Sequence, residues 1–393
     1  MSVRKRLGTD KWCHDYFDGN GKRHQMLYRT QKEAKEAEAK VRMELKGNVH
    51  VADPNSITVK EAGASWLKAC DKLERSTRDQ YKGHLENHIY PNIGKTKLSK
   101  IGVPFVYAFL DKLREQGLSE PMVRAVRVSL GALLSNAQKQ GLVVFNAVKE
   151  MGRDSKPKGD GRHKKRLKVG VDIPTTDEVK LIIAAAKEGR ARIFLRTAAL
   201  TGMRASELRG LTWDAIDFVK REIEVSQRAD AYGKLGSPKS SSGIRTLPIG
   251  DKLFAELREW KLACTSRKLV FPSLPRKVDN ALQRDNVMNH ANIIKDWLHP
   301  AQISAGVTVK TGEVDNDGNP MIAPKYTGLH ALRHYYASYC INAKEDGGAG
   351  LAAKMVQERL GHSSIVMTLD VYGHLFPKGN ASVELAAAEA ALY

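Results

Sequence analysis

The sequence predicts a multidomain, mainly α-helical protein with small β-sheets. Three observations indicate this class. The chain has 393 residues, which is room for two or three domains that each bury a core. Apolar residues recur at helical spacing over most of the length, whereas strand-like runs are short. A basic stretch without apolar periodicity, residues 152–168, divides the chain. We therefore expect an N-terminal module of three strands plus a helix, a helical bundle, and a mixed α/β domain.

Residues 1–55 are expected to form the first module. The runs VRKRL, WCHDYFD and HQMLYR are short and strand-like, and Gly8 and the GNGK sequence at 19–22 supply turn signals between them. QKEAKEAEAKVRMEL, which follows, is typical of a helix. The alternative to a binding module is a small folding cap, because small β modules have many uses.

Residues 56–151 are expected to form an all-helical bundle. We expect helices beginning near Val59 and Ser76, and two more at 104–116 and 119–140. Thr58 or Ser56 can cap the first helix, Ser76 can cap the second, and Pro91 follows the second. Several basic residues in this bundle are candidates for phosphate contacts, although for each one taken singly a solvated surface position is the better interpretation. They include Arg75, Arg78, Lys82, Lys95, Lys97, Arg124 and Arg127.

Residues 152–171 are expected to be a basic interdomain linker. The part from 152 to 168 has eight Lys or Arg against two Asp, and its Gly and Pro content does not suit a packed element. The whole chain has a formal net charge of +20 and a sequence pI of about 9.7, so its field attracts polyanions. Excess lysine can also serve solubility alone, but the clustering of the charge favours nucleic acid as the partner.

Residues 172–378 are expected to form the mixed α/β domain. A capping box at 175–178 opens the first helix, and helices follow at 190–200 and 205–212. Three antiparallel strands are expected at 216–218, 222–227 and 244–249, with Lys239 in the Gly- and Ser-rich turn before the last one. The remainder of this domain is expected to be mostly helical, interrupted at 306–326 by a loop or short hairpin. Residues 379–393, which follow the domain, are expected to be a tail helix that docks on its own domain or on a neighbouring protomer.

Three strings in this domain carry cationic and nucleophilic side chains. In GLHALRHYYASYCI, at 328–341, His330 and Arg333 share a helix face, while Leu332, Tyr335, Tyr336 and Tyr339 can face a core. In LTGMRASELRGLTW, at 200–213, Arg204 stands at the start of a helix, where free N–H groups favour an anion. LGHSSIVMTLDVYGHL, at 360–375, contributes His362 and Tyr372.

These strings, in this order, resemble the tyrosine recombinase (phage integrase) family. The resemblance covers about residues 172–376 and, more loosely, the whole chain. It implies that Arg204 and Arg333 clamp the scissile phosphate, that Tyr372 attacks it, and that Lys239, His330 and His362 complete the catalytic set. It also implies that residues 1–55 bind accessory arm sites and that residues 56–151 are a core-binding domain. A single HxxR or LGH match is weak, but three in order are specific.

The chemistry of phosphodiester cleavage suits these residue types. Planar guanidinium groups bind both non-bridging oxygens in a way that lysine does not. A phenol has an ordinary pKa near 10, so we expect clustered cations to lower the pKa of Tyr372 and a neutral imidazole to take its proton. We assign His330 as that acid/base, His362 as a phosphate hydrogen-bond donor and Lys239 as the proton donor to the leaving oxygen. His334 is expected to be a helix-packing histidine.

No metal or other cofactor is expected. The four cysteines, at 13, 70, 264 and 340, are far apart and form no zinc spacing, and no paired carboxylates stand near the three strings. No leader sequence and no apolar run of membrane-spanning length are found, which favours a cytoplasmic, nucleoid-associated protein of a bacterial host with no membrane partner.

The sequence therefore predicts a site-specific recombinase that integrates or excises a mobile element through a 3′-phosphotyrosine, without metal or ATP. The resemblance implies double-stranded DNA with core and arm-type sites as the partner, a homotetramer on that DNA, and accessory DNA-bending proteins. Two alternatives stay open at this point. A type IB topoisomerase shares the nucleophile and arginines but acts as a monomer, and a non-catalytic DNA-binding regulator keeps only the fold.

Overall fold

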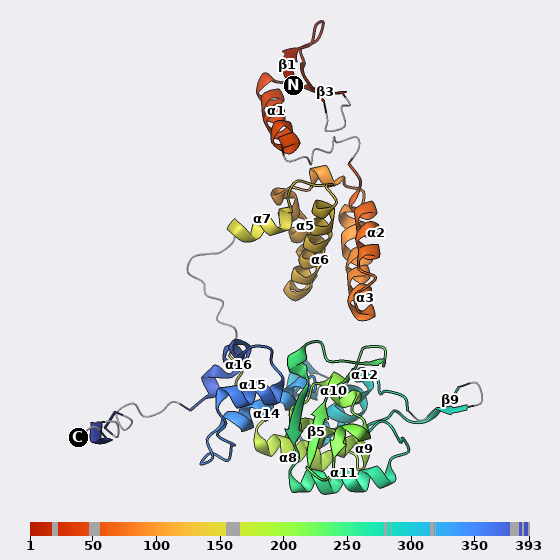
Figure 1. The fold of residues 1–393 in the computed structure, drawn as a ribbon, viewed down its shortest axis with the longest axis vertical. Helices are drawn as coiled ribbons and strands as arrows, with labels where there is room; N and C mark the ends of the chain where they lie inside the picture. The colour runs from red at the N-terminus through yellow and green to blue at the C-terminus, as the bar shows by residue number, and fades with distance from the viewer. Residues whose placement is uncertain are drawn as a thin grey trace. The chain divides into compact units, whose positions relative to one another are not determined.

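The structure is a computed structural model that describes residues 1–17, 23–46, 56–154, 166–278, 281–283, 285–314, 318, 320–377, 385–386 and 389–391. The chain divides into two compact units, Met1–Gly161 and Arg162–Tyr393 (Figure 1). Most of the predicted linker and most of the predicted tail helix lie outside the described residues. No helix in the described part of the chain is both long and apolar enough to span a membrane.

The N-terminal module has the predicted order of three strands and a helix. Strands β1 (Ser2–Lys5), β2 (Trp12–Phe17) and β3 (Arg23–Tyr28) form an antiparallel sheet with β2 in the centre. Helix α1 (Gln31–Lys46) contacts all three strands, and its residue Ala34 is fully buried. Asp15 of β2 accepts ion pairs from Arg4 and Arg23, one on each neighbouring strand, so its buried charge is compensated.

The remainder of the first unit is a helical bundle, as predicted. Its helices are α2 (Val59–Ala69), α3 (Arg75–His84), α4 (Tyr90–Ile93), α5 (Val103–Glu115), α6 (Glu120–Lys139) and α7 (Ala147–Asp154). Thr58 caps α2 in a capping box with Glu61. The predicted cap at Ser76 is wrong, because α3 begins one residue earlier, after Glu74. Helix α7 was not predicted. It is anchored by Ala147 and Met151, which are buried in the bundle core, and it ends three residues beyond the predicted domain boundary at 151.

A π-helical turn carries the second helix of the bundle beyond Pro91. The turn spans Leu85–Ile89, and the N–H of Tyr90 donates to the carbonyl of Leu85. Proline has no N–H to donate and its ring crowds a regular helix, so a widened turn just before it removes the conflict. The same device, Ile294–Leu298, precedes Pro300. The sequence signal that Pro91 ends a helix was therefore misleading here.

Three helices and a three-stranded sheet form the larger core of the second unit. Helices α8 (Thr176–Ala185), α9 (Arg190–Thr201) and α11 (Asp251–Ala263) pack together, and α8 starts at the predicted capping box. The predicted sheet is confirmed as β4 (Ile216–Asp217), β5 (Glu222–Val225) and β8 (Arg245–Pro248), in the order β4-β5-β8. Phe194, Ile223 and Leu247 lie in this core, which ties the sheet to α9.

Helix α10 (Ala205–Arg209) is shorter than the predicted 205–212. It ends at Gly210 because the backbone of Arg228 and Ala229 comes so close that a Cβ on Gly210 would lie 2.7 Å from it. This close strand is β6 (Arg228–Ala229), which pairs with β7 (Leu235–Gly236). Lys239 lies between β7 and β8, in the predicted turn region.

The remaining elements connect α11 to the last three helices. In chain order they are the hairpin of β9 (Arg276–Val278) and β10 (Ala281–Gln283), the helices α12 (His290–Ile293) and α13 (His299–Ser304), and the hairpin of β11 (Thr308–Val314) and β12 (Pro320–Pro324). The second hairpin shows that the predicted interruption at 306–326 is a β-hairpin. The final helices are α14 (His330–Ile341), α15 (Ala353–Leu360) and α16 (Ile365–Tyr372).

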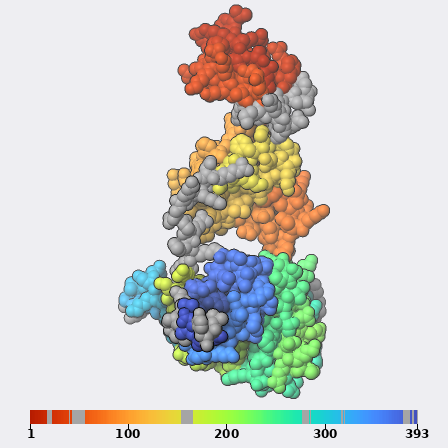
Figure 2. Space-filling model, turned by 60° about the vertical axis from the view of Figure 1, so that its left-hand side comes forward, coloured from red at the N-terminus to blue at the C-terminus, as the bar shows by residue number. Residues whose placement is uncertain are grey.

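These last helices enclose a second, smaller core. It contains Tyr336, Cys340, Val356, Leu360 and Tyr372. Helix α14 packs on α9, and in Figure 2 the blue C-terminal helices lie directly against the green part of the same unit. The predicted inward position of Tyr339 is wrong, because this residue is 41% exposed.

Candidate active site

Helix α14 carries three site residues on one face. His330, Arg333 and His334 are separated by three and four positions, so their side chains lie on adjacent turns. The rings of His330 and His334 meet edge to face with centroids 4.5 Å apart. Arg333 is only 2% exposed, and its guanidinium donates to the carbonyls of Gly202 at 2.6 Å and Leu360 at 2.5 Å. Arg333 is thus fixed before any substrate arrives.

The end of α9 and the start of α10 position Arg204. Gly202 ends α9 in the left-handed conformation, with φ of 60°. The ring of Tyr336 packs so closely on it that a Cβ on Gly202 would lie 2.3 Å from a ring carbon. Arg204 is the residue before α10, and its N–H donates to the carboxylate of Glu207. The Arg204 guanidinium binds the same carboxylate at 2.9 Å and the carbonyl of Gly361 at 3.0 Å. Its side chain remains 37% exposed, so it can still contact a ligand.

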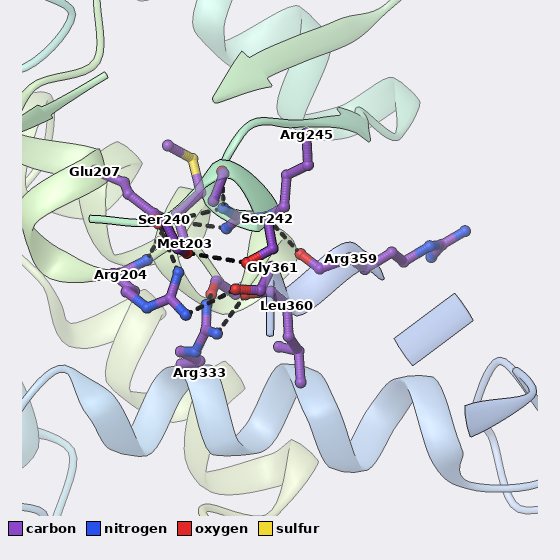
Figure 3. A network of polar contacts seen from close by, with 12 residues as sticks. Met203, Arg204, Glu207, Ser240, Ser242, Arg245, Arg333, Arg359, Leu360 and Gly361 are labelled. Atoms are coloured by element: carbon purple, nitrogen blue, oxygen red, sulfur yellow. Dashed lines mark hydrogen bonds and ion pairs between the residues drawn. The ribbon is translucent and has the colours of Figure 1, made fainter. Parts of the chain in front are cut away.

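Three guanidinium groups cap the carbonyl end of helix α15. The carbonyls of Arg359, Leu360 and Gly361 accept hydrogen bonds from Arg245, Arg333 and Arg204 respectively. Figure 3 shows these three arginines converging on the turn at Leu360 and Gly361. The last carbonyls of a helix have no partner within it and carry partial negative charge, so cations stabilise them. We call residues 359–361 the capped turn.

His362 follows the capped turn directly. Gly361 takes the left-handed conformation, with φ of 62°, and a Cβ there would lie 3.0 Å from both Arg245 and the carbonyl of Ser242. The Nδ1 of His362 lies 2.9 Å from the hydroxyl of Thr368, and its ring stacks on Tyr372 with centroids 6.5 Å apart. If the hydroxyl of Thr368 donates, the ring proton of a neutral His362 is on Nε2.

Tyr372 is the last residue of α16 and is 2% exposed. Its hydroxyl lies 2.7 Å from Nδ1 of His334. Burial raises the pKa of Tyr372 to about 12, although the charge of Arg333 acts in the opposite direction. The expectation that nearby cations lower this pKa below its ordinary value is therefore wrong for this structure, because loss of solvent around the phenol outweighs the cations.

The imidazoles around Tyr372 are held neutral. Desolvation, reinforced by His330 and Arg333, lowers the pKa of His334 to about 4. Desolvation and then the cations lower the pKa of His362 to about 4 as well, and they lower the pKa of His330. A neutral imidazole can accept a proton at pH 7. His334 faces inward and packs against the phenol of Tyr372, as expected for a helix-packing histidine.

The structure brings together five of the six predicted catalytic residues. Hydrogen bonds connect Arg204 and Arg333 to the capped turn before His362, and a ring contact and a hydrogen bond connect His330 through His334 to Tyr372. The sixth, Lys239, is exposed on the loop before β8 and makes no hydrogen bond or ion pair within the described part of the chain. Ser240 and Ser242 of that loop lie beside the arginine network, with their hydroxyl oxygens 2.9 Å apart (Figure 3).

Sequence reasoning missed Glu207 and Arg245. Both are almost fully buried, with side chains 2% and 5% exposed, and they form a two-pronged ion pair. Signals for both existed in the sequence. Glu207 is three residues after Arg204, at the position of a capping-box acid, and Arg245 shares a strand face with buried Leu247. Among the residues with described positions, no group of three or more His, Cys, Asp or Glu could hold a metal ion.

Comparisons with known protein families match both units. The model of the phage integrase family matches residues 174–378, and that of the phage integrase N-terminal SAM-like domain matches residues 58–114. A XerC-like tyrosine recombinase of Caldanaerobacter subterraneus subsp. tengcongensis is 26% identical over 383 residues, which covers 92% of this chain and 90% of the relative. The ICEBs1 integrase of Bacillus subtilis is 26% identical over 372 residues, which covers 92% and 91%.

Solved structures share the fold. The Tn1549 transposon integrase in complex with transposon right end DNA superposes with a TM-score of 0.58 at 18% identity, covering 86% of this chain and 100% of that one. A lambda integrase dimer bound to a COC′ core site gives a TM-score of 0.53 at 19% identity, covering 93% of each chain. The helical bundle, the small sheet and the final helices are therefore a known arrangement.

Proposed function

This chain belongs to the phage integrase family of tyrosine recombinases, and we propose that Tyr372 is the nucleophile with which it cleaves and rejoins DNA strands. The protein is a site-specific DNA recombinase of the kind that moves mobile elements. The observation that carries the assignment is the phenol of Tyr372 held 2.7 Å from a neutral imidazole and packed against a turn capped by three arginines.

Arg204 and Arg333 supply the charge that the reacting phosphate needs. Attack on phosphorus concentrates negative charge on the non-bridging oxygens, and two guanidinium groups already fixed by protein carbonyls need little reorganisation to bind it. Each such donor contributes on the order of 3 to 4 kcal/mol to transition-state stabilisation. His362 is the third donor in our proposal, because its contact with Thr368 leaves Nε2 as the N–H that faces away from that partner.

The phenolic proton goes to His334. As the bond from the Tyr372 oxygen to phosphorus forms, the bond from phosphorus to the 5′ oxygen breaks, and Nδ1 of His334 takes the phenolic proton. His330, exposed and in edge contact with His334, remains our acid/base on the solvent side of this pair. This proposal changes the assignment made from the sequence, in which His330 takes the proton from Tyr372 directly.

Lys239 is the proposed proton donor to the 5′ oxygen. Its ammonium is exposed on the loop between β7 and β8, so it is available to a ligand. Rejoining reverses every step: the 5′ hydroxyl attacks the phosphotyrosine, and Tyr372 regains its proton. The energy of the broken strand stays in the phosphotyrosine bond, so the cycle balances without ATP.

We assign the other segments by their composition and by the relatives. Residues 1–55 are proposed to bind arm-type DNA sites, and residues 56–151 to bind the core site. Residues 152–171 are proposed to follow the DNA phosphates between the domains. The catalytic domain at 172–378 is then followed by a docking tail, residues 379–393. Lambda integrase has been solved as a tetramer bound to a Holliday junction. We propose a homotetramer on DNA for this chain too, with accessory DNA-bending proteins.

Trapping the covalent intermediate tests the proposal. The full chain is incubated in excess EDTA with a nicked duplex that contains its core site and releases, after cleavage, a short fragment that carries the 5′ hydroxyl. We expect a DNA adduct that maps to Tyr372 and disappears in Tyr372→Phe, which should bind the duplex as well as the unaltered chain. An adduct on another tyrosine, or a strict need for magnesium in the chemical step, would refute the assignment.

A further inference from the structure

Arg245 directs four of its five N–H groups at partners inside the protein. Its Nε donates to the carbonyl of Arg359 at 2.7 Å, Nη1 to the carbonyl of Gly243 at 3.0 Å and to Glu207 at 3.2 Å, and Nη2 to Glu207 at 2.8 Å. Its side chain is 5% exposed, and its two Nη groups already bind the two oxygens of the Glu207 carboxylate, which is the way in which they would bind a phosphate. This separates it from Arg204, which is 37% exposed.

Glu207 is the link between Arg245 and Arg204. One carboxylate oxygen accepts from the guanidinium groups of both arginines, and the other accepts from Arg245 and from the backbone N–H of Arg204. Desolvation would raise the pKa of this buried carboxyl, but the hydrogen bonds and charge of Arg245, followed by those of Arg204, hold it below its ordinary value. Glu207 is therefore ionised, and it fixes the direction in which Arg204 points.

Arg245 also joins two loops of the site. Gly243, which accepts from Nη1, ends the short helical turn of the loop that contains Lys239. Arg359, which accepts from Nε, begins the capped turn that leads into His362. The Lys239 loop, the Arg204 segment and the His362 turn come from three separate parts of the sequence, and Arg245 contacts all three (Figure 3).

We propose that Arg245 is a positioning residue of this active site, which sets Arg204 through Glu207 and sets the capped turn before His362 directly. It does not touch the DNA. Lysine cannot replace it, because a single ammonium cannot bridge two carboxylate oxygens and a carbonyl in one plane. A displacement of about 1 Å in a clamping group is enough to slow a reaction by about a hundredfold. The proposal rests on the role of Arg204 proposed above.

The test uses the full chain with Arg245→Lys, Glu207→Gln, Arg204→Ala and a control, Arg258→Gln. Arg258 is an exposed arginine on α11 that contacts the ring of Phe254 and no site residue. Single-turnover adduct formation is measured on two nicked duplexes. One carries the ordinary scissile phosphate, and the other carries a methylphosphonate, in which a methyl group replaces one non-bridging oxygen and removes the negative charge. DNA affinity and the thermal unfolding midpoint are measured in parallel.

We expect Arg245→Lys and Glu207→Gln to cleave the ordinary phosphate about a hundredfold more slowly while they bind DNA within about threefold of the unaltered chain. On the methylphosphonate, where no charge has to be clamped, the deficit should shrink at least tenfold for these variants, as it should for Arg204→Ala. A residue that only supports the fold would show the same deficit on both substrates. Arg258→Gln should match the unaltered chain on both.

Three results overturn the inference: an unaffected Arg245→Lys, equal deficits on the two substrates, or failure of both Arg245→Lys and Glu207→Gln to fold. The proposed function fails in a different way. If the unaltered chain forms no adduct at Tyr372, the nucleophile assignment is wrong. If it forms the adduct and Arg245→Lys forms it equally fast, only the positioning role is wrong.

Discussion

The hydroxyl of Tyr372 lies 2.7 Å from Nδ1 of His334, although the two residues are 38 positions apart and come from different helices. Burial raises the pKa of the phenol to about 12 and lowers the pKa of the imidazole to about 4. In the resting site the proton therefore stays on Tyr372, and the imidazole is free to accept it.

This pair predicts a change in the pH dependence of cleavage when His334 is replaced. His334 is neutral above about pH 5 and gains a proton only as the pH falls through about 4, so the unaltered chain should keep its rate from pH 9 down to about 5.5. In His334→Gln the phenol must lose its proton to hydroxide, so the rate should be low and should rise about tenfold for each pH unit.

Single-turnover adduct formation from pH 5.5 to 9 measures this. His299→Gln, a histidine whose Nε2 contacts the carbonyl of Thr327, is the control and should keep the flat profile. If the rate of His334→Gln does not change with pH, whatever its absolute value, His334 does not take the phenolic proton.

Two glycines at the ends of one helix predict different costs for the same substitution. Gly202→Ala places a Cβ 2.3 Å from the ring of Tyr336 at φ of 60°, so strain and overpacking should together lower the free energy of unfolding by about 2 to 4 kcal/mol. Gly189 has φ of 76° and ψ of −130°, which an L residue rarely adopts, but nothing lies within 4 Å of its Cβ position, so Gly189→Ala should cost about 1 to 3 kcal/mol of backbone strain without overpacking. Denaturant titration of both variants checks this.

Gly202→Ala should also slow cleavage, because the carbonyl of Gly202 holds Arg333. Gly189→Ala should cleave normally. Equal stability of the two variants would show that the ring of Tyr336 moves aside freely.

Lys239 predicts a defect that depends on the leaving group. If its ammonium protonates the 5′ oxygen, Lys239→Ala should slow cleavage by about 100- to 10,000-fold on ordinary DNA. A substrate with sulfur at the 5′ bridging position has a leaving group that needs no proton, so there Lys239→Ala should nearly match the unaltered chain. Lys234→Ala, an exposed lysine before the same loop, is the matched control. An equal defect on both substrates would assign Lys239 to DNA binding.

The N-terminal module predicts a separable function. A chain that begins at residue 56 should still cleave a core site, because every proposed catalytic residue lies beyond position 200. It should lose recombination that depends on distant arm sites, because two DNA-binding units on one chain raise the effective concentration of the second contact. Gel-shift and integration assays with the truncated and full chains measure both effects. Undiminished integration by the truncated chain would make residues 1–55 a folding cap.

The sequence alone determined the elements and the chemical types of the site residues. Helical spacing placed His330 and Arg333 on one face of α14, the capping box at Thr175 marked the start of α8, and the three strings identified the family. These signals are local: they depend on periodicity over a few turns or on residues within four positions of one another. A local signal can also mislead. Pro91 predicted the end of a helix, but a π-helical turn before it lets the helix continue.

Only the tertiary structure decided which groups touch. Arg204 reaches a carbonyl 157 positions away at Gly361, and Arg245 reaches one 114 positions away at Arg359. The alternation of β8 places Arg245 on the same face as Leu247, but it does not show that Arg245 meets Glu207 and Arg359. Likewise, the pattern of α14 does not show that His334 meets Tyr372. These contacts follow from how α9, α14 and α15 pack, and the burial produced by that packing is also what separates the pKa values of His334 and Tyr372.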